Sequence, residues 1–280
     1  MFKNMVERFI KRRSHIRNRQ IALVGTCFKS SEEEDLLFEE AEEAIENTYH
    51  WYAKTDLPCT LPVKNGGYFP ITNSNIIESM AFSQYIHTLL EQKTLPVIFS
   101  NSCESFIECL AAYDTGDIGV ININHRVDLV NKLSFIPMQG YASILTQKSD
   151  INMLSIGVFE DFHTTPELNL AKSMGVEWLN STAFYSTSPS IYEELDIFLF
   201  NHNAIALNID LRAIVRGMTI KPPYAIDLDL LLSIVSRCIH SNKTVLIQLT
   251  GDNDALIFAK EVQSVLNIIR KKMEHEFYPA

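Results

Sequence analysis

Short apolar runs alternate along this chain with longer segments in which apolar residues recur at the spacing of a helix. Near-continuous apolar runs are typical of strands that are buried on both faces of a sheet. Strands that alternate with helices predict a parallel sheet with helices on both faces. We therefore predict an α/β protein, a three-layer α/β/α fold with a mainly parallel central sheet, whose strands lie at residues 20–26, 95–100, 119–123, 153–159, 197–200, 204–209 and 244–249.

Helices are predicted between these strands. Ser30 or Ser31 can cap a helix with an acidic first turn, an arrangement that the helix dipole favours. Residues 54–74 contain Pro58, Pro62, Pro70 and the pair Gly66-Gly67, which favours a loop with little regular structure. The helices are expected at residues 30–50, 75–93, 104–113, 166–174, 227–240 and 254–271.

Four polar residues, Asn124, His125, Arg126 and Asp128, stand at the end of the strand predicted at 119–123. In open α/β sheets, ligands bind at the carboxyl ends of the strands. Because alternate side chains of an extended chain share a face, Asn124, Arg126 and Asp128 are expected to point one way and His125 the other. One face would then carry an amide, a cation and a carboxylate.

Two other predicted strands lead into similar residues. The strand at 95–100 is followed by Asn-Ser-Cys-Glu-Ser, in which Glu104 opens a predicted helix, and the strand at 204–209 ends around Asn208 and Asp210. Since the carboxyl ends of neighbouring parallel strands meet at one edge of a sheet, we expect these side chains to converge there.

These three segments resemble the metal-binding motifs of the ureohydrolases, the family of arginases, agmatinases and formimidoylglutamases. The family's motifs are Asp-Ala-His-x-Asp, Gly-Gly-Asp-His-Ser and Asp-x-Asp, and together they bind two manganese ions. Laid on the first motif, Asn124, Arg126 and Asp128 stand for Asp, His and Asp. Glu104 stands for the His of the second motif, and Asn208 and Asp210 stand for the two Asp of the third.

The resemblance covers residues 21–271 and implies a single arginase-like domain over 1–280, with a basic segment at 1–19. It places Gln248 near a family glutamate that grips the substrate's guanidinium. The family keeps a proton-shuttling His in the loop after Asp128, and the corresponding residues 135–142 contain no His.

The altered residues predict that the chemistry has changed. Asn124 and Asn208 replace the two bridging aspartates, so two negative charges that would offset the metal ions are missing. Arg126 cannot bind a metal and repels a dication. We therefore expect a ureohydrolase-like pseudoenzyme without the manganese site, a catalytic residue or a cofactor, which acts as a binding, scaffold or regulatory protein.

In that interpretation Arg126 pairs with Asp128 and Asp210, with Glu104 nearby, so that the protein's own cation takes the electrostatic place of the metal. The alternative is an active hydrolase of linear amidines that holds one Mn²⁺ through Glu104, Asp128, Asp210 and the amide oxygens. A small guanidino or amidine-like ligand fits either interpretation. The resemblance also implies a homo-oligomer, since family members form trimers or hexamers.

Composition narrows the class of protein further. With 280 residues and 46% hydrophobic positions the chain can build a sizeable core, and its net charge of −10 argues against a nucleic-acid binder. Five cysteines, odd in number and without CxxC spacing, predict reduced thiols and a cytoplasmic location. The basic segment 1–19 is too charged and too short in apolar residues to span a membrane. It predicts either a solvated helix or a surface for a membrane or an acidic partner.

Overall fold

In the computed structural model the described residues are 20–29, 35–54, 63–72, 76–113, 116–129, 140–181, 189–214, 226–251 and 259–277. The basic segment 1–19, the predicted capping residues Ser30 and Ser31, and Pro58 and Pro62 of the predicted loop lie outside these ranges, as does most of the loop after Asp128. None of the described helices is both long and apolar enough to cross a bilayer.

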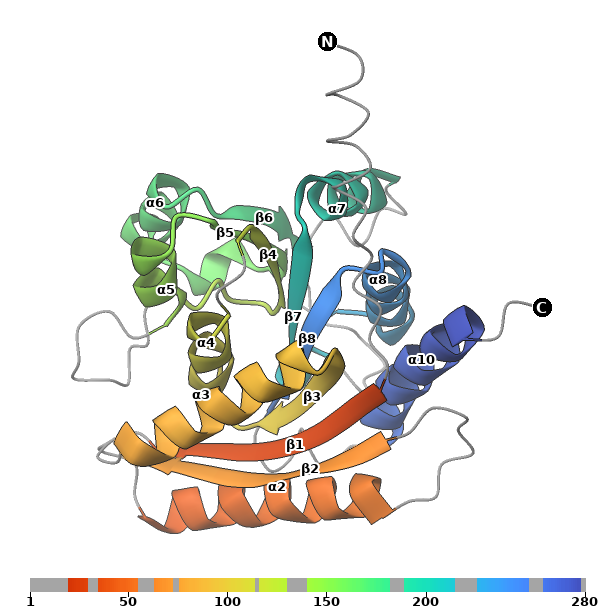
Figure 1. The fold of residues 1–280 in the computed structure, drawn as a ribbon. Helices are drawn as coiled ribbons and strands as arrows, with labels where there is room; N and C mark the ends of the chain where they lie inside the picture. The colour runs from red at the N-terminus through yellow and green to blue at the C-terminus, as the bar shows by residue number, and fades with distance from the viewer. Residues whose placement is uncertain are drawn as a thin grey trace, which may run out of the picture.

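A parallel sheet forms the middle of the molecule (Figure 1). Among the described residues it has eight strands in the order β2-β1-β3-β8-β7-β4-β5-β6, and every neighbouring pair is parallel. The strands are β1 (Gln20–Lys29), β2 (Val63–Thr72), β3 (Thr94–Ser100), β4 (Ile118–Ile123), β5 (Ile151–Val158), β6 (Glu177–Asn180), β7 (Ala204–Asp210) and β8 (Thr244–Thr250).

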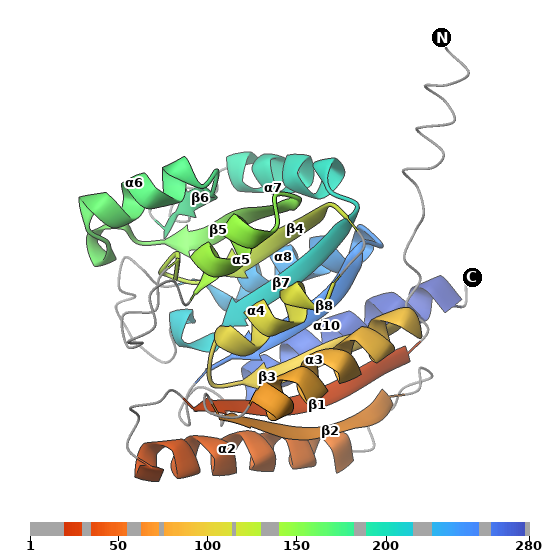
Figure 2. The same cartoon turned by 60° about the vertical axis from the view of Figure 1, so that its left-hand side comes forward.

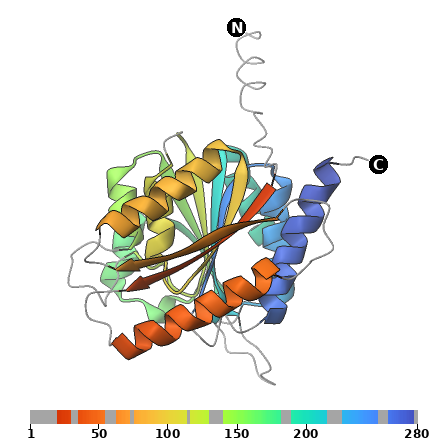
Figure 3. The ribbon, with the colours of Figure 1, turned by 60° about the horizontal axis from the view of Figure 1, so that its bottom comes forward.

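Helices cover both faces of this sheet, as Figures 2 and 3 show from two further directions. They are α2 (Asp35–Lys54), α3 (Ile76–Glu91), α4 (Glu104–Ala111), α5 (Tyr141–Gln147), α6 (Thr165–Ser173), α7 (Pro189–Asn201), α8 (Leu228–His240) and α10 (Ala259–Phe277), with the short 3-10 helices η1 (Glu160–Phe162) and η3 (Leu211–Ala213).

The core consists of two apolar layers, one on each face of the sheet. Side chains of α2, α7, α8 and α10 share one cluster, and those of α3, α4, α5 and α6 share the other. Successive residues of β1 alternate between them, with Ile21 and Leu23 in the first and Ala22 and Val24 in the second. The structure thus confirms the predicted three-layer α/β/α fold.

Two segments were predicted wrongly. Residues 63–72 form the edge strand β2, not a loop, and Pro70 is tolerated because an edge strand needs hydrogen-bond donors on one side only. Gly66 allows a close approach there, since a Cβ atom would lie 2.7 Å from the backbone oxygen of Leu23. Residues 197–200 are the last turn of α7, not a strand. The apolar run contributes Phe198 and Leu199 to the core as part of an amphipathic helix.

Two short elements were missed altogether. Helix α5 and strand β6 carry no long apolar run, and both lie toward the β6 side of the sheet (Figure 2). The other predicted strands, and the predicted helices from 75–93 to 227–240, match described elements to within three residues. The helices predicted at 30–50 and 254–271 overlap α2 and α10, which end four and six residues later, and residues 30–34 and 254–258 lie outside the described ranges.

Candidate functional site

The candidate site lies at the carboxyl ends of four adjacent strands, β3, β8, β7 and β4. In-register pairing sets Asn122 of β4 beside Asn208 of β7, and Asn208 beside Gln248 of β8. Asp210 pairs in the same way with Thr250. The fold therefore brings the ends of these strands, and the polar residues on them, close together.

The chain leaves the sheet directly after β4. The strand ends at Ile123, so the expected strand alternation of residues 124–128 is wrong, and the segment is a turn in which Asp128 has a left-handed backbone with φ of 50°. In this turn the Asn124 amide donates to the carboxylate of Asp128 and accepts the Arg126 backbone N–H at 3.3 Å. The Asp128 carbonyl accepts the Tyr141 backbone N–H at 3.2 Å. A turn, and not a strand, therefore gathers these side chains.

His163 fixes this turn, a role that the sequence analysis missed. Its Nε2 accepts the backbone N–H of Val127 at 3.1 Å, so its Nδ1 carries the proton and donates to the Phe159 carbonyl at 3.0 Å. His125 packs edge-on against Phe162 of η1 with ring centroids 5.3 Å apart. Burial lowers the pKa of His125, and the nearby Asp210 carboxylate acts in the opposite direction.

Arg212 is the cation that holds Asp210. The Asp210 carboxylate is buried, with 1% of its surface exposed. It accepts the Arg212 backbone N–H at 2.9 Å, the Nε–H at 2.9 Å and the Nη2–H at 2.7 Å. Arg126 instead lies 3.8 Å from Asp128, measured from Nε to Oδ1. The sequence analysis assigned the cation to Arg126 alone. The spacing Asp210-Leu-Arg212 directly after a buried strand was the overlooked signal.

Carboxylates gather around this pair. Burial and the charge of Asp210 raise the pKa of Asp128 to about 6, against the opposing effects of Arg212, Arg126 and the Asn124 hydrogen bond. The pKa of the Cys103 thiol is raised by burial and then by the charges of Asp128, Glu104 and Asp210. Glu104 itself is buried at the start of α4. Three carboxylates from three segments thus act on the Cys103 thiol, and Asp210 also acts on Asp128.

A buried chain of hydrogen bonds between uncharged side chains joins β4, β7, β8 and α4. The Asn208 amide donates to Asn122 Oδ1 at 2.9 Å, and its Oδ1 accepts the Thr250 hydroxyl at 2.8 Å. Gln248 donates to Thr250 Oγ1 at 2.8 Å and accepts the Ser105 hydroxyl at 3.0 Å. The amides of Asn208 and Gln248 are therefore engaged within the protein.

The sequence analysis named Asn208 and Gln248 but not Asn122, Ser105 or Thr250. For Asn122 and Thr250 the signal was a polar residue inside an otherwise apolar strand, since a buried polar group needs a partner, and Ser105 lies in helix α4. Asn122 lies in register with Asn208, and this pairing is visible only once the strand order is known.

Comparison with known proteins identifies the architecture. No protein-family model and no curated protein matches the sequence. Among solved structures, formimidoylglutamase from Bacillus subtilis superposes with a TM-score of 0.75 at 17% identity, over 91% of this chain and 87% of that one. The chain has the ureohydrolase fold.

Two further structures support this assignment of the ureohydrolase fold. Arginase from Bacillus subtilis gives a TM-score of 0.65 at 16% identity, over 91% of this chain and 97% of that chain. Agmatine ureohydrolase from Thermoplasma volcanium gives 0.61 at 12% identity, over 94% of each chain. The likeness spans nearly the whole chain, while the low identities leave the chemistry to be argued from this chain's own residues.

Proposed function

We propose that this chain is a ureohydrolase-fold protein without the dinuclear manganese site and without amidine hydrolysis, which acts as a binding, scaffold or regulatory protein. The observation that carries the proposal is the engagement of Asp210 by Arg212. Both carboxylate oxygens of Asp210 accept hydrogen bonds from the guanidinium, at 2.9 Å and 2.7 Å. A metal ion would have to displace a permanently charged fork from a buried partner.

The other donor atoms fit manganese no better. Asn124 and Asn208 offer neutral amide oxygens where the family has bridging carboxylates, and the Asn208 oxygen already accepts the Thr250 hydroxyl. In the part of the chain that the structure describes, no three His, Cys, Asp or Glu side chains are arranged to hold a metal ion. We infer that an internal guanidinium takes the electrostatic place of the metal pair.

A small guanidino or amidine-like compound is the ligand that this site favours. The Asp128 side chain is 26% exposed and the Arg126 Nε lies 3.8 Å from it, so its carboxylate can receive a ligand while Arg212 stays on Asp210. A planar cation could then form two parallel hydrogen bonds with Asp128. Methylguanidine should therefore bind, and urea, its neutral analogue, should not. Calorimetric titration of both compounds tests this part.

Metal analysis and activity together test the main proposal. The purified protein, supplied with manganese, should retain less than one ion per chain after dialysis and should not hydrolyse arginine, agmatine or formiminoglutamate. Stoichiometric manganese together with hydrolysis that a chelator abolishes and manganese restores would instead establish the single-metal amidine hydrolase.

A cytoplasmic location and self-association belong to the same proposal. The four cysteines among the described residues, Cys27, Cys103, Cys109 and Cys238, are free thiols, which supports a reducing compartment.

A further inference from the structure

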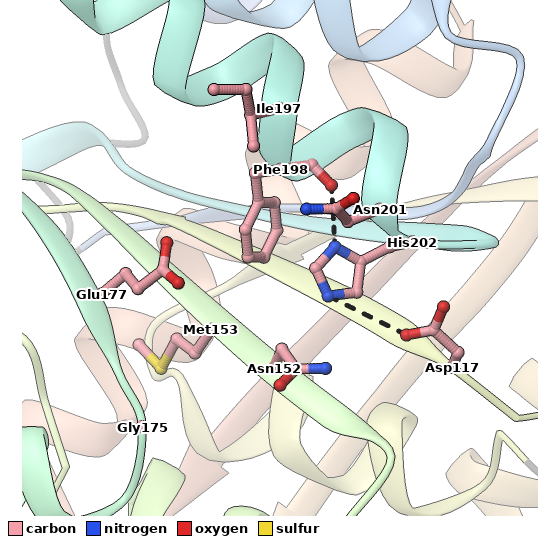
Figure 4. A pocket seen from close by; sticks show the side chains of 9 residues that line it. All are labelled: Asp117, Asn152, Met153, Gly175, Glu177, Ile197, Phe198, Asn201 and His202. Carbon is pink, nitrogen blue, oxygen red and sulfur yellow. Dashed lines mark hydrogen bonds and ion pairs between the residues drawn. The ribbon is translucent and has the colours of Figure 1, made fainter.

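A hollow lies at the amino ends of the strands, where β4, β5 and β6 begin and α7 ends (Figure 4). Its volume is about 310 Å³, at the lower end of the range for small-molecule pockets. Because it adjoins the amino ends of the strands, it is separate from the candidate site and does not rest on the proposed function. It is lined by Asp117, Asn152, Met153, Gly175, Glu177, Ile197, Phe198, Asn201 and His202.

His202 is a buried polar side chain that faces this hollow. It is 7% exposed, and its ring lies against Phe198 with centroids 4.2 Å apart. Its Nδ1 donates to the Phe198 carbonyl at 2.7 Å, so Nε2 carries the lone pair of the neutral ring. Asp117 Oδ1 lies 3.8 Å from Nε2, beyond hydrogen-bond distance. Within the described chain, no hydrogen bond reaches Nε2.

Gly119 makes room for this ring. A Cβ atom at that position would lie 2.8 Å from His202 Cγ and 2.7 Å from Phe198 Cε1. The imidazole can therefore lie this close to β4 only because this residue has no side chain.

The lining has one sign of charge. Among the residues that the structure describes, it includes the carboxylates of Asp117 and Glu177 and no lysine or arginine. In Figure 4 the rings of Phe198 and His202 lie between these two carboxylates. Met153 and Ile197 add apolar surface beside the Phe198 ring. A cation with a short apolar body would meet hydrogen-bond acceptors, an aromatic ring and an apolar wall.

We propose that this hollow binds a small primary amine with a short aliphatic chain. Its ammonium group donates one N–H to Nε2 of His202 and a second to Oδ1 of Asp117, two acceptors 3.8 Å apart that both need a donor. The aliphatic chain lies along Phe198 and Ile197. Glu177 adds a second negative charge at the rim.

The test uses n-butylamine as the probe and n-butanol as its uncharged counterpart. Titration into the full chain, followed through the His202 ring signals by NMR, should give saturable binding of the amine only. Asp117→Asn should weaken binding about tenfold, the loss expected for one charge-assisted hydrogen bond. Glu177→Gln, on an exposed residue, should weaken it about threefold, which is the effect of a more distant charge at the surface.

Glu194→Gln is the matched control, because it removes the same charge from an exposed position of α7 that does not line the hollow. It should leave the affinity for n-butylamine unchanged. Equal binding of butylamine and butanol would overturn the proposal, as would equal affinities in the wild type, Asp117→Asn and Glu177→Gln. Loss of methylguanidine binding at the carboxyl ends of the strands would not affect it, so the two proposals fail separately.

Discussion

At the scale of single residues, the candidate site depends on which arginine reaches which carboxylate. Asp210 is almost fully buried and receives both its charge balance and its hydrogen bonds from Arg212. Asp128 has a weaker partner, since Arg126 stays 3.8 Å away, and it retains a raised pKa. The two aspartates should therefore respond differently to substitution.

Removing the Arg212 guanidinium should be costly. Arg212→Ala leaves the buried Asp210 carboxylate without a cation, and we expect a loss of about 3 kcal/mol in the free energy of unfolding. Arg212→Lys keeps the charge but loses the planar fork and should lose less. Urea denaturation at pH 7.5 measures both. If adding Asp210→Asn to Arg212→Ala does not recover stability, the pairing carries less weight than we assign to it.

Asp128 should make the protein less stable as the pH rises. With a pKa of about 6 in the folded protein and 3.8 as its ordinary value, the folded state binds an extra proton between these pH values. The contribution of Asp128 is therefore most favourable below pH 4 and falls through pH 6, by roughly 3 kcal/mol in total.

Asp128→Asn, which mimics the protonated form, should remove this dependence. The variant should be more stable than the wild type at pH 8 and nearly equal to it at pH 4, in urea denaturation at both values. Asp150→Asn, at an exposed position, is the control. A difference between Asp128→Asn and the wild type that stays constant with pH would contradict the assignment.

At the scale of elements, close contacts and buried hydrogen bonds hold the strand ends in place. The chain of hydrogen bonds from Asn122 through Asn208 and Thr250 to Gln248 crosses three strands without a charge. At the amino ends of the strands, Gly119 lets the last turn of α7 lie directly on β4. Hydrogen bonds thus join neighbouring strands at their carboxyl ends, and close packing joins α7 to β4 at the amino end of that strand.

Gly119→Ala should push α7 away from β4. Its methyl group would meet Phe198 and the His202 ring at under 3 Å, and we expect a loss of about 1–3 kcal/mol, as for other overpacked sites. Thermal and urea unfolding measure it. Asn152→Ala, the exposed register partner of Gly119 on β5, should change stability by less than about 0.5 kcal/mol. Equal stability of the two variants would show that the contact is loose.

At the scale of the whole molecule, the ureohydrolase fold raises the question of whether the manganese site can be restored. Arg126→His with Asn124→Asp and Asn208→Asp returns three family ligands to their positions, and Arg212→Ala in the same chain frees the Asp210 carboxylate from its guanidinium. Without metal this fourfold variant should be less stable than the wild type, because it gathers carboxylates and removes two cations. Added manganese should raise its melting temperature and leave the wild type unchanged. Stabilisation of the wild type by manganese would count against the proposed loss of the site.

Self-association is the second prediction at this scale. The resemblance to a family of trimers and hexamers leads us to expect an oligomer. Exposed apolar side chains such as Ile77 and Met80 on α3, 78% and 64% exposed, are compatible with a buried interface. Light scattering of the purified chain measures the mass directly. A monomer of 31.9 kDa at micromolar concentration would refute this expectation.

The sequence by itself determined the layers, the strands of the sheet interior and the convergence of the three polar segments at the carboxyl ends of those strands. An interior strand is buried on both faces, so most of its consecutive residues are apolar, as in 119–123 and 204–209. Edge and surface elements carry a weaker pattern. Residues 63–72 tolerate proline because β2 is an edge strand. Residues 197–200 have the apolar pattern of a strand because all four residues of this turn of α7 are apolar.

Only the tertiary structure decided which charges meet. Arg126 and Arg212 are equally permanent cations in the sequence, and their different roles depend on where β4 ends and how η3 leaves β7. Likewise, Asn122 accepts a hydrogen bond from Asn208, which lies 86 positions away in the chain. His202 lies 3.8 Å from Asp117, which is 85 positions away. Electrostatic and hydrogen-bond energies depend on distances in space. Local periodicity fixes burial but not those distances.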